Sequence, residues 1–351
     1  MHRLARSALV VTLCVIWGCG AALAQAQTRT ITDSAGRRVD IPLRVSKVLA
    51  AGPPGSILLY TLAPKKMVGW VRTPSPAEKE FLLPSVRDLP EYGRLTGRGG
   101  TANIENILKF NPDLIIDVGS VGATYVSLAN NVQEQTKIPH ILLDGTFAKT
   151  PENYRLLGDL LGVKERAEQL AQYADETLNG LAARVASIPQ AERPRVYYGR
   201  GVNGLETGLA GSINMEVLEK VGATNVAAAA GTGGITKVSM EQVLSWNPDV
   251  ILALDPAFYR SVATDPLWAS VKAVRDQRIY LSPNLPYGWF DAPPGVNRLI
   301  GVRWLMSLLY PKQFPDDLRG VTRDFYKRFY QVDLNDQQLD GLLNTATASK
   351  K

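Results

Sequence analysis

Short apolar runs recur along the chain, and stretches with helical spacing separate them. Apolar runs without polar alternation are typical of strands buried on both faces of a parallel sheet. These runs occupy residues 45–51, 114–116, 139–144, 195–199, 250–252 and 278–282. Strands that alternate with helices predict an α/β chain made of βα units, in which helices flank central parallel sheets.

One helix-to-strand unit occurs twice. Residues 104–116 and 240–252 align at a constant offset of 136 (240 − 104). In both copies a short amphipathic helix ends at Asn-Pro-Asp, because the residue before a proline is disfavoured in the α region, and an apolar strand follows. The repeat predicts two lobes of similar construction. The matched pairs include Glu105 and Glu241, Leu108 and Leu244, Asn111 and Asn247, and Asp113 and Asp249.

A long helical stretch lies between the two copies. Leucine and alanine recur at helical spacing through residues 151–188, with one break near Gly162. A helical connector is stiffer than a pair of loops, so we expect only modest closure of the lobes. The predicted division is a signal peptide at 1–26, an N-terminal lobe at 27–150, a connecting helix at 151–188, a C-terminal lobe at 189–292, and closing helices with a tail at 293–351.

The N-terminus has the pattern of an export signal. Arg3 and Arg6 precede an apolar stretch at residues 8–17, and small residues of the kind that signal peptidase recognises follow it. We expect cleavage after Ala24 or Ala26 and a periplasmic location. A retained membrane anchor is an alternative, because the uncharged stretch is nearly long enough to span a bilayer. A second alternative is a lipoprotein with the lipid on Cys19.

Composition excludes several kinds of chemistry. The 39 Lys and Arg residues against 33 Asp and Glu give a mild charge of +6, and no basic run predicts a nucleic-acid partner. Cleavage would remove both cysteines and leave one histidine, His140, inside an apolar strand. A thiol-based metal site, a cysteine nucleophile or a disulfide scaffold is then impossible. We therefore expect no catalytic residue, no protein-bound metal and no cofactor.

These features together resemble the periplasmic substrate-binding proteins of ABC importers, in the class that serves iron–siderophores, haem and vitamin B12. The most specific segments are the two repeated helices with Asn-Pro-Asp, residues 222–226 and residues 288–298. Residues 204–214 and 304–311 resemble the branch for metal complexes, which includes molybdate and tungstate receptors. The resemblance implies two lobes around a ligand cleft, and a monomer that delivers its cargo to a permease dimer and its ATPase.

Glu105 and Glu241 are the candidate docking residues. They occupy the same position in both copies, so lobes related by a pseudo-two-fold axis would present a matched acidic pair to symmetric basic sockets. In the family that this chain resembles, glutamates at these motif positions dock on permease arginines. The structural alternative is that an acidic residue early in a helix favours the helix dipole.

Loops after the carboxyl ends of the strands should line the cleft. They are rich in arginine, whose guanidinium group binds anionic oxygen atoms bidentately, and in aromatic residues, whose faces line flat chelators. The candidate ligand-binding residues are Arg94, Arg98, Tyr198, Arg200, Tyr259, Arg260, Tyr287 and Trp289.

Three hypotheses follow for function. The first is a receptor for a ferric siderophore or similar metal chelate, with an open cleft of arginines and aromatics. The second is a molybdate or tungstate receptor with a small closed pocket of backbone amides and hydroxyls, for which residues 97–100 or 210–214 are candidates. The third is an exported α/β enzyme, which would have to use His140. Gly99 stands where the resembling vitamin B12 receptor has a tryptophan, which argues against cobalamin.

Overall fold

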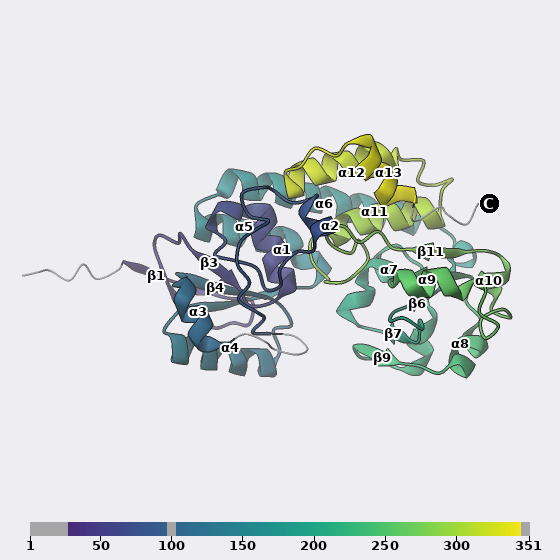
Figure 1. Cartoon of the computed structure of the whole chain (residues 1–351), viewed down its shortest axis with the longest axis horizontal. Coiled ribbons are helices and arrows are strands. Elements are labelled where there is room, and N and C mark those ends of the chain that lie inside the picture. The colour runs from purple at the N-terminus through teal and green to yellow at the C-terminus, as the bar shows by residue number, and fades with distance from the viewer. Residues whose placement is uncertain (1–26, 97–102, 345–351) are drawn as a thin grey trace, which may run out of the picture.

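Two parallel sheets, one in each lobe, organise the chain, and a layer of helices covers both lobes (Figure 1). The computed structural model describes residues 27–96 and 103–344. The predicted signal peptide, Cys19, Arg98, Gly99 and the residue 97–100 loop as a whole lie outside the described residues. The α/β fold class with two lobes is confirmed.

The N-terminal lobe has a three-stranded parallel sheet in the order β3-β4-β5. Its strands are β3 (Val48–Ala50), β4 (Leu114–Gly119) and β5 (His140–Asp144). Its helices are α1 (Pro53–Leu62), α2 (Pro76–Lys79), α3 (Ile104–Phe110) and α4 (Ala123–Thr136). An antiparallel hairpin of β1 (Thr28–Thr32) and β2 (Arg38–Pro42) precedes the sheet.

The C-terminal lobe has a four-stranded parallel sheet in the order β11-β10-β6-β8. Its strands are β6 (Arg195–Gly199), β8 (Thr224–Asn225), β10 (Val250–Ala253) and β11 (Ile279–Leu281). Its helices are α7 (Glu216–Lys220), α8 (Met240–Trp246), α9 (Pro256–Val262) and α10 (Lys272–Arg275). An antiparallel pair, β7 (Glu206–Gly208) and β9 (Ile235–Lys237), lies beside the sheet.

The two copies of the repeat fold in the same way. Helices α3 and α8 both end at an asparagine in the left-handed conformation, Asn111 with φ 45° and Asn247 with φ 41°. Asp113 and Asp249 follow, and each carboxylate accepts a backbone N–H at or just before the first residue of the neighbouring strand. The duplication read from the sequence is therefore a duplication of backbone geometry.

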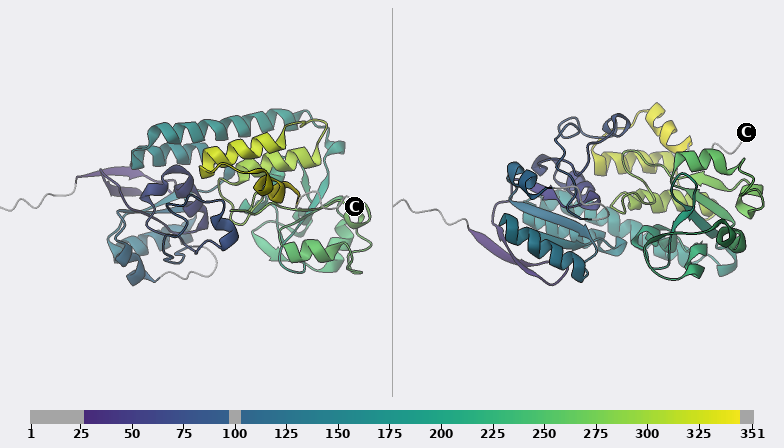
Figure 2. Two further views of the ribbon diagram at one scale, coloured as in Figure 1. Left: turned by 45° about the horizontal axis from the view of Figure 1, so that its top comes forward. Right: turned by 60° about the horizontal axis from the view of Figure 1, so that its bottom comes forward.

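The covering layer joins the lobes. Helix α6 packs on α1 of the N-terminal lobe and on α7 of the C-terminal lobe (Figure 2). Gly162, with φ 68°, ends the preceding helix and separates it from α6, as the sequence predicted. One hydrophobic cluster extends from the N-terminal sheet through this layer into the C-terminal lobe. The layer consists of α5 (Thr150–Leu161), α6 (Lys164–Ala186), α11 (Arg298–Leu309), α12 (Leu318–Phe325) with its π-helical extension (Tyr326–Tyr330), and α13 (Asp336–Asn344).

Candidate ligand-binding site

Two adjoining cavities lie in the cleft between the lobes. One has a volume of about 350 Å³ and the other about 660 Å³. Both are lined by residues of the two lobes, and Pro53, Arg94, Arg200 and Pro293 border both cavities. The cleft therefore has one junction at which residues from both lobes meet.

Strand ends supply most of the larger cavity. Its walls include the segment after β3, the end of β4 with the following loop, the last residue of β5 and the residue after β6. This is the edge at which open parallel sheets bind ligands. The residues contributed in this way are Gly52, Pro53, Pro54, Asp117, Val118, Gly119, Ser120, Val121, Gly122, Asp144 and Arg200.

The N-termini of α1 and α4 border the larger cavity, and neither carries a side-chain cap. A helix N-terminus has a partial positive charge and favours an anion. Helix α1 begins with Pro53 and Pro54, which have no backbone N–H group. Its N-terminus therefore has the partial positive charge of the helix dipole but lacks the hydrogen-bond donors of its first two residues. Helix α4 begins after Gly122 and keeps its backbone donors, which makes this end the better anion site of the two.

The carboxylate of Asp291 fixes the side chain of Arg200 at the cleft. Its Nη1 atom donates to Asp291 and lies 3.4 Å from the hydroxyl oxygen of Tyr198. The Asp291 side chain is 1% exposed and also accepts a 2.7 Å hydrogen bond from Nδ2 of Asn214. Only Nη1 takes part in these contacts, so the guanidinium retains donors for a ligand.

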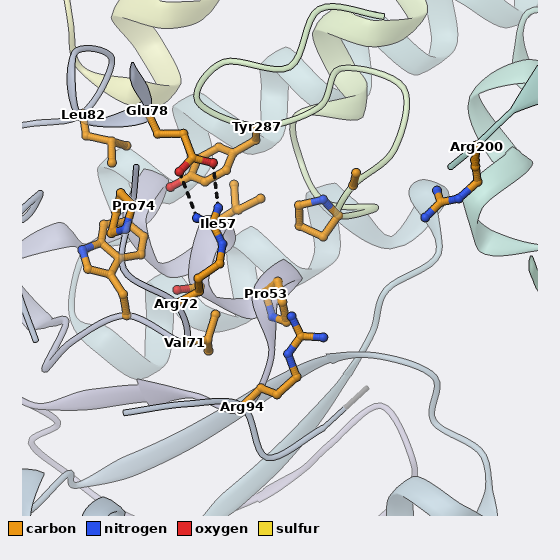
Figure 3. A pocket seen from close by; sticks show the side chains of 14 residues that line it. Pro53, Ile57, Val71, Arg72, Pro74, Glu78, Leu82, Arg94, Arg200 and Tyr287 are labelled. Carbon is orange, nitrogen blue, oxygen red and sulfur yellow. Dashed lines mark hydrogen bonds and ion pairs between the residues drawn. The ribbon is translucent and has the colours of Figure 1, made fainter. Parts of the chain in front are cut away.

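Arg94 approaches the junction from the N-terminal lobe. Figure 3 shows Arg94 and Arg200 extending toward the same space from opposite sides. A third arginine of the smaller cavity, Arg72, is neutralised by Glu78, with Nη–Oε distances of 2.6 and 3.0 Å. Tyr287 and Trp70 add aromatic wall to this cavity. Arg200, like Arg72, is paired with a carboxylate, and the cationic side chains that line this cavity are Arg72, Arg94 and Arg200.

The larger cavity also contains acidic side chains. Asp117, Asp144 and Glu206 line it together with the two arginines. Asp117 is 4% exposed, and burial raises the pKa of its carboxyl from 3.8 to about 6. All three line the larger cavity and none lines the smaller one. Sequence reasoning missed them, although Asp117 and Asp144 each end an apolar run.

Two expected ligand residues are in the core. Tyr198 and Trp289 are both 0% exposed and do not line either cavity. Tyr198 lies beneath Arg200, whereas Nε1 of Trp289 donates to the hydroxyl of Tyr326 at 3.2 Å. The Trp289 backbone also packs closely on α11, since a Cβ atom on Gly301 would be 1.8 Å from its carbonyl oxygen. The loop therefore turns Trp289 inward, which corrects the expectation that it faces the ligand.

Tyr259 and Arg260 lie on α9 and do not line the cleft cavities. Asp255 caps this helix immediately after β10, and Tyr259 packs against the core of its own lobe while Arg260 is exposed. Of the eight candidates, the structure brings Arg94, Arg200 and Tyr287 together and places four elsewhere. Arg98 is outside the described residues.

Glu105 and Glu241 are both exposed, in the first turns of α3 and α8. The two helices belong to different lobes and lie away from the covering helices (Figure 1). Hydrogen bonding with the Ser239 side chain holds the pKa of Glu241 below its ordinary value, so this carboxylate is charged. The geometry is compatible with a matched acidic pair.

The metal-ligating residue types and His140 bear on other kinds of chemistry. Within residues 27–96 and 103–344, no three His, Cys, Asp or Glu side chains gather where they could hold a metal ion. His140 is 0% exposed, neither ring nitrogen has a partner, and burial lowers its pKa to about 3. It cannot reach a substrate in the cleft as a general base. In the described part of the chain, no helix combines the length and apolar character needed to cross a membrane.

A two-lobed α/β fold with arginines from both lobes at one cleft defines a ligand-binding receptor. The model of the periplasmic binding protein family matches residues 65–285, and the chain belongs to this family of ABC importer components. Its partners are therefore a permease with its ATPase and a small-molecule ligand, and members of the family are periplasmic.

One sequence relative and two solved structures are similar to the chain over most of its length. The chain is 29% identical over 332 residues to the molybdate-binding protein MolA of Haemophilus influenzae, covering 87% of this chain and 91% of that protein. The solved structure of MolA bound to molybdate matches with a TM-score of 0.72 at 25% identity, over 88% of this chain and 99% of that one. An ABC transporter solute-binding protein of Sulfurospirillum deleyianum matches with a TM-score of 0.81 at 29% identity, over 90% and 99%.

Proposed function

We propose that the chain captures an oxyanion of the molybdate and tungstate class in the cleft and delivers it to the permease of an ABC importer. The observation that carries this proposal is the convergence of Arg94 and Arg200, one from each lobe, on the junction of the two cavities. An anion placed there would meet two guanidinium groups, of which that of Arg200 is held by Asp291. The similarity to a molybdate-binding protein supports the same class of cargo.

The junction offers three kinds of anion contact. The guanidinium groups donate charge-assisted hydrogen bonds, each worth about 1.5–3 kcal/mol. The Gly119–Gly122 segment and the N-terminus of α4 add backbone donors. Pro53 and Pro293 provide apolar walls that limit competition from water. Binding by both lobes would couple ligand capture to a small closure of the cleft.

The second candidate is an anionic ferric chelate such as a ferric siderophore. The observation that favours it is the volume of about 660 Å³, which exceeds what one tetrahedral oxyanion fills and lies within the range of about 300–1,000 Å³ for small-molecule sites. Tyr125, Tyr287 and Trp70 supply aromatic surface for an organic chelator. Both candidates place the negative charge between Arg94 and Arg200.

Calorimetric titration of the purified receptor distinguishes the two candidates. Molybdate and tungstate are compared with ferric citrate, a ferric hydroxamate and a ferric catecholate. The proposal expects saturable binding of molybdate and tungstate, and ligand at a hundred times its Kd should stabilise the protein by about 2.7 kcal/mol. Binding of a ferric chelate alone would transfer the function to the second candidate. Binding of neither class would contradict both.

We also propose that the exported protein is a monomer, cleaved after Ala24 or Ala26, that docks on its permease through Glu105 and Glu241. The proposed docking surface, formed by Glu105 and Glu241, also has an apolar component in both copies of the repeat. Leu108 and Leu244, three residues after each glutamate, are 46% and 39% exposed. Residues three apart on a helix share a face, so each lobe presents one carboxylate beside one exposed leucine. A homodimeric permease offers two equivalent sockets to such a pair.

A further inference from the structure

One buried arginine joins the two lobes next to the larger cavity. Arg298, the first residue of α11, is 2% exposed and lines neither of the two cleft cavities. Its Nη2 atom donates at 2.8 Å to the carbonyl oxygen of Gly145, directly after β5 of the N-terminal lobe. Its Nη1 atom donates at 3.3 Å to the carbonyl oxygen of Ile213 in the C-terminal lobe, and also to Glu216. One guanidinium group therefore binds both lobes.

The segments that this guanidinium group contacts are walls of the larger cavity. Asp144 and Thr146, on either side of Gly145, line the cavity from the N-terminal lobe. Ile213 and its neighbour Asn214 line it from the C-terminal lobe. Each wall therefore contains, or directly adjoins, a carbonyl group that the buried arginine holds.

A second contact reinforces the connection between the lobes. Oε2 of Glu216 accepts a hydrogen bond from Nη1 of Arg298 and another, at 3.0 Å, from the backbone N–H of Phe147 in the N-terminal lobe. The guanidinium carbon of Arg298 also lies 4.9 Å from the centre of the Phe147 ring. Its Nε atom donates at 3.0 Å to the carbonyl oxygen of Gly295, so the guanidinium group is fixed on each of its edges.

Both walls are themselves tied to the rest of the site. Gly145 donates at 2.8 Å to the carbonyl oxygen of Gly119 at the end of β4, and a Cβ atom on Gly145 would lie 2.7 Å from the Cα atom of Gly119. The N-terminal wall therefore cannot move without its sheet. In the other wall, Asn214 donates at 2.7 Å to Asp291, the carboxylate that fixes Arg200. A change at either wall would thus be transmitted to the binding site.

We propose that Arg298 is a positioning residue of the ligand site, which sets the separation of the two cavity walls and with it the separation of Arg94 and Arg200. This inference rests on the proposed function, in which both lobes hold one oxyanion. A ligand held by two lobes binds tightly only when the walls stand at the right separation, and walls that are already in place avoid the cost of ordering them. Arg298 therefore supports binding without touching the ligand.

The variant Arg298→Lys separates this role from loss of the buried charge. A lysine keeps a cation beside Glu216, but one ammonium group lacks the planar fork that reaches carbonyl oxygens of both lobes. Spin labels on Glu134→Cys in α4 and Ser245→Cys in α8 report the distance between the lobes by pulsed electron paramagnetic resonance. Both positions are exposed, and from residue 27 onward the chain has no other cysteine.

The distance distributions have a defined expectation. Without ligand, the wild type should give a narrow distribution that shifts only slightly when molybdate saturates the cleft. Arg298→Lys should give a broader distribution without ligand, and saturating molybdate should narrow it again, because the ligand then bridges the lobes in place of the arginine.

Calorimetric titration with molybdate gives the second readout. The apparent Kd is the intrinsic Kd divided by the binding-competent fraction, so a fall of this fraction to about one tenth raises the Kd of Arg298→Lys about tenfold. Glu216→Ala removes the contact with Phe147 and should change both readouts in the same direction, which keeps the test decisive if Arg298→Lys does not fold. The matched control is Leu181→Ala, a core truncation on α6 outside both cavities. It should unfold at lower urea concentration but keep the wild-type distance distribution and Kd.

The outcomes separate this inference from the proposed function. If Arg298→Lys keeps the wild-type distribution, or broadens it without a change in Kd, Arg298 does not position the site and the proposed cargo stands. Equal broadening in Leu181→Ala would assign the effect to lost stability and overturn the inference. If the wild type binds no molybdate, the proposed cargo fails. The distributions without ligand then still decide whether Arg298 sets the separation of the walls.

Discussion

Asp291 holds Arg200 at the junction of the two cavities, although the residues are 91 positions apart. Arg200 follows β6, whereas Asp291 belongs to the loop before α11 and is almost fully buried. Asn214 donates to the same carboxylate, which fixes it further. An arginine held in this way loses little side-chain freedom when a ligand arrives, and that lowers the entropic cost of binding.

The first prediction concerns the two cleft arginines. Arg200→Ala and Arg94→Ala should each weaken the binding of an anionic ligand about 10- to 100-fold, which corresponds to about 1.5–3 kcal/mol for a charge-assisted contact. The matched control is Arg260→Ala, because Arg260 is an exposed arginine of α9 that lines neither cavity. Calorimetric titration gives the three affinities. An Arg200→Ala protein that binds as tightly as the wild type would remove Arg200 from the site.

The second prediction concerns charge at the docking surface. Replacing Glu105 and Glu241 together with Ala should reduce uptake of the ligand about tenfold or more, since each lobe loses its contact with a basic socket. Ligand affinity of the purified protein should not change. The control is Glu165→Ala, an exposed first-turn glutamate of α6 without a mate in the repeat. Equal uptake by all three strains would contradict docking through these residues.

The third prediction concerns the apolar half of the same surface. Leu108→Ser combined with Leu244→Ser should lower uptake while cleft affinity and thermal stability stay at wild-type values, because both side chains are exposed in the free protein. Leu267 is 66% exposed and belongs to neither copy of the repeat, so Leu267→Ser is the control. Photo-crosslinking probes at positions 108 and 244 should react with one and the same membrane polypeptide. Reaction with two unrelated polypeptides would argue against a symmetric partner.

The fourth prediction concerns the contact between the lobes. Arg298 is 2% exposed, donates to Glu216 in the C-terminal lobe, and donates at 2.8 Å to the carbonyl of Gly145 after β5. Arg298→Met leaves Glu216 without its cation and should cost about 3–5 kcal/mol of unfolding free energy. Urea unfolding measures the change. Arg319→Met breaks exposed ion pairs between α12 and α13 and should have little effect. A similarly small loss for Arg298→Met would show that the buried pair is dispensable.

The fifth prediction concerns acid sensitivity. Folded His140 stays neutral down to about pH 3, whereas the unfolded chain protonates it below its ordinary pKa of 6.5. Protons therefore favour the unfolded state as the pH falls through this window. Between pH 7 and pH 5 the wild type should lose about 2 kcal/mol more than His140→Leu does. Urea unfolding at both pH values tests this, and identical losses would show that His140 does not contribute.

Asp117 acts on stability in the opposite direction. Its pKa is raised on folding, from 3.8 to about 6, so the folded state takes up this proton first and gains stability as the pH falls below about 6. The two effects partly cancel in the wild type. The pH dependence of the whole protein is therefore a poor guide to either residue, and only the difference between wild type and variant isolates His140.

The repeat made most of the fold predictable. Asn-Pro-Asp marks a helix end and a strand start in each lobe, and the structure repeats both the asparagine conformation and the aspartate contacts. Helix α4 was not predicted, because among its residues only Ala129, Val132 and Thr136 are buried and its apolar pattern is weak. The β1–β2 hairpin was also not predicted, although Val39 and Ile41 alternate with polar residues in β2 and are buried in the core.

The site was less predictable than the fold. Arg200 was found because it directly follows a strand, and position after a strand determines which edge of the sheet a residue occupies. Trp289 was misplaced because strand position does not determine which way a loop turns, and here the backbone contact at Gly301 turns it inward. Asp117 was missed because it reads as the end of a buried strand, and its unsatisfied oxygen is visible only in three dimensions.

The continuous hydrophobic cluster that passes through α6 has a consequence for the exchange of lobes between receptors. Each lobe buries part of its apolar surface against helices that the other lobe also uses. Neither lobe expressed separately would retain that burial. A single lobe could therefore not be transferred to another receptor without also transferring the helices that join the two.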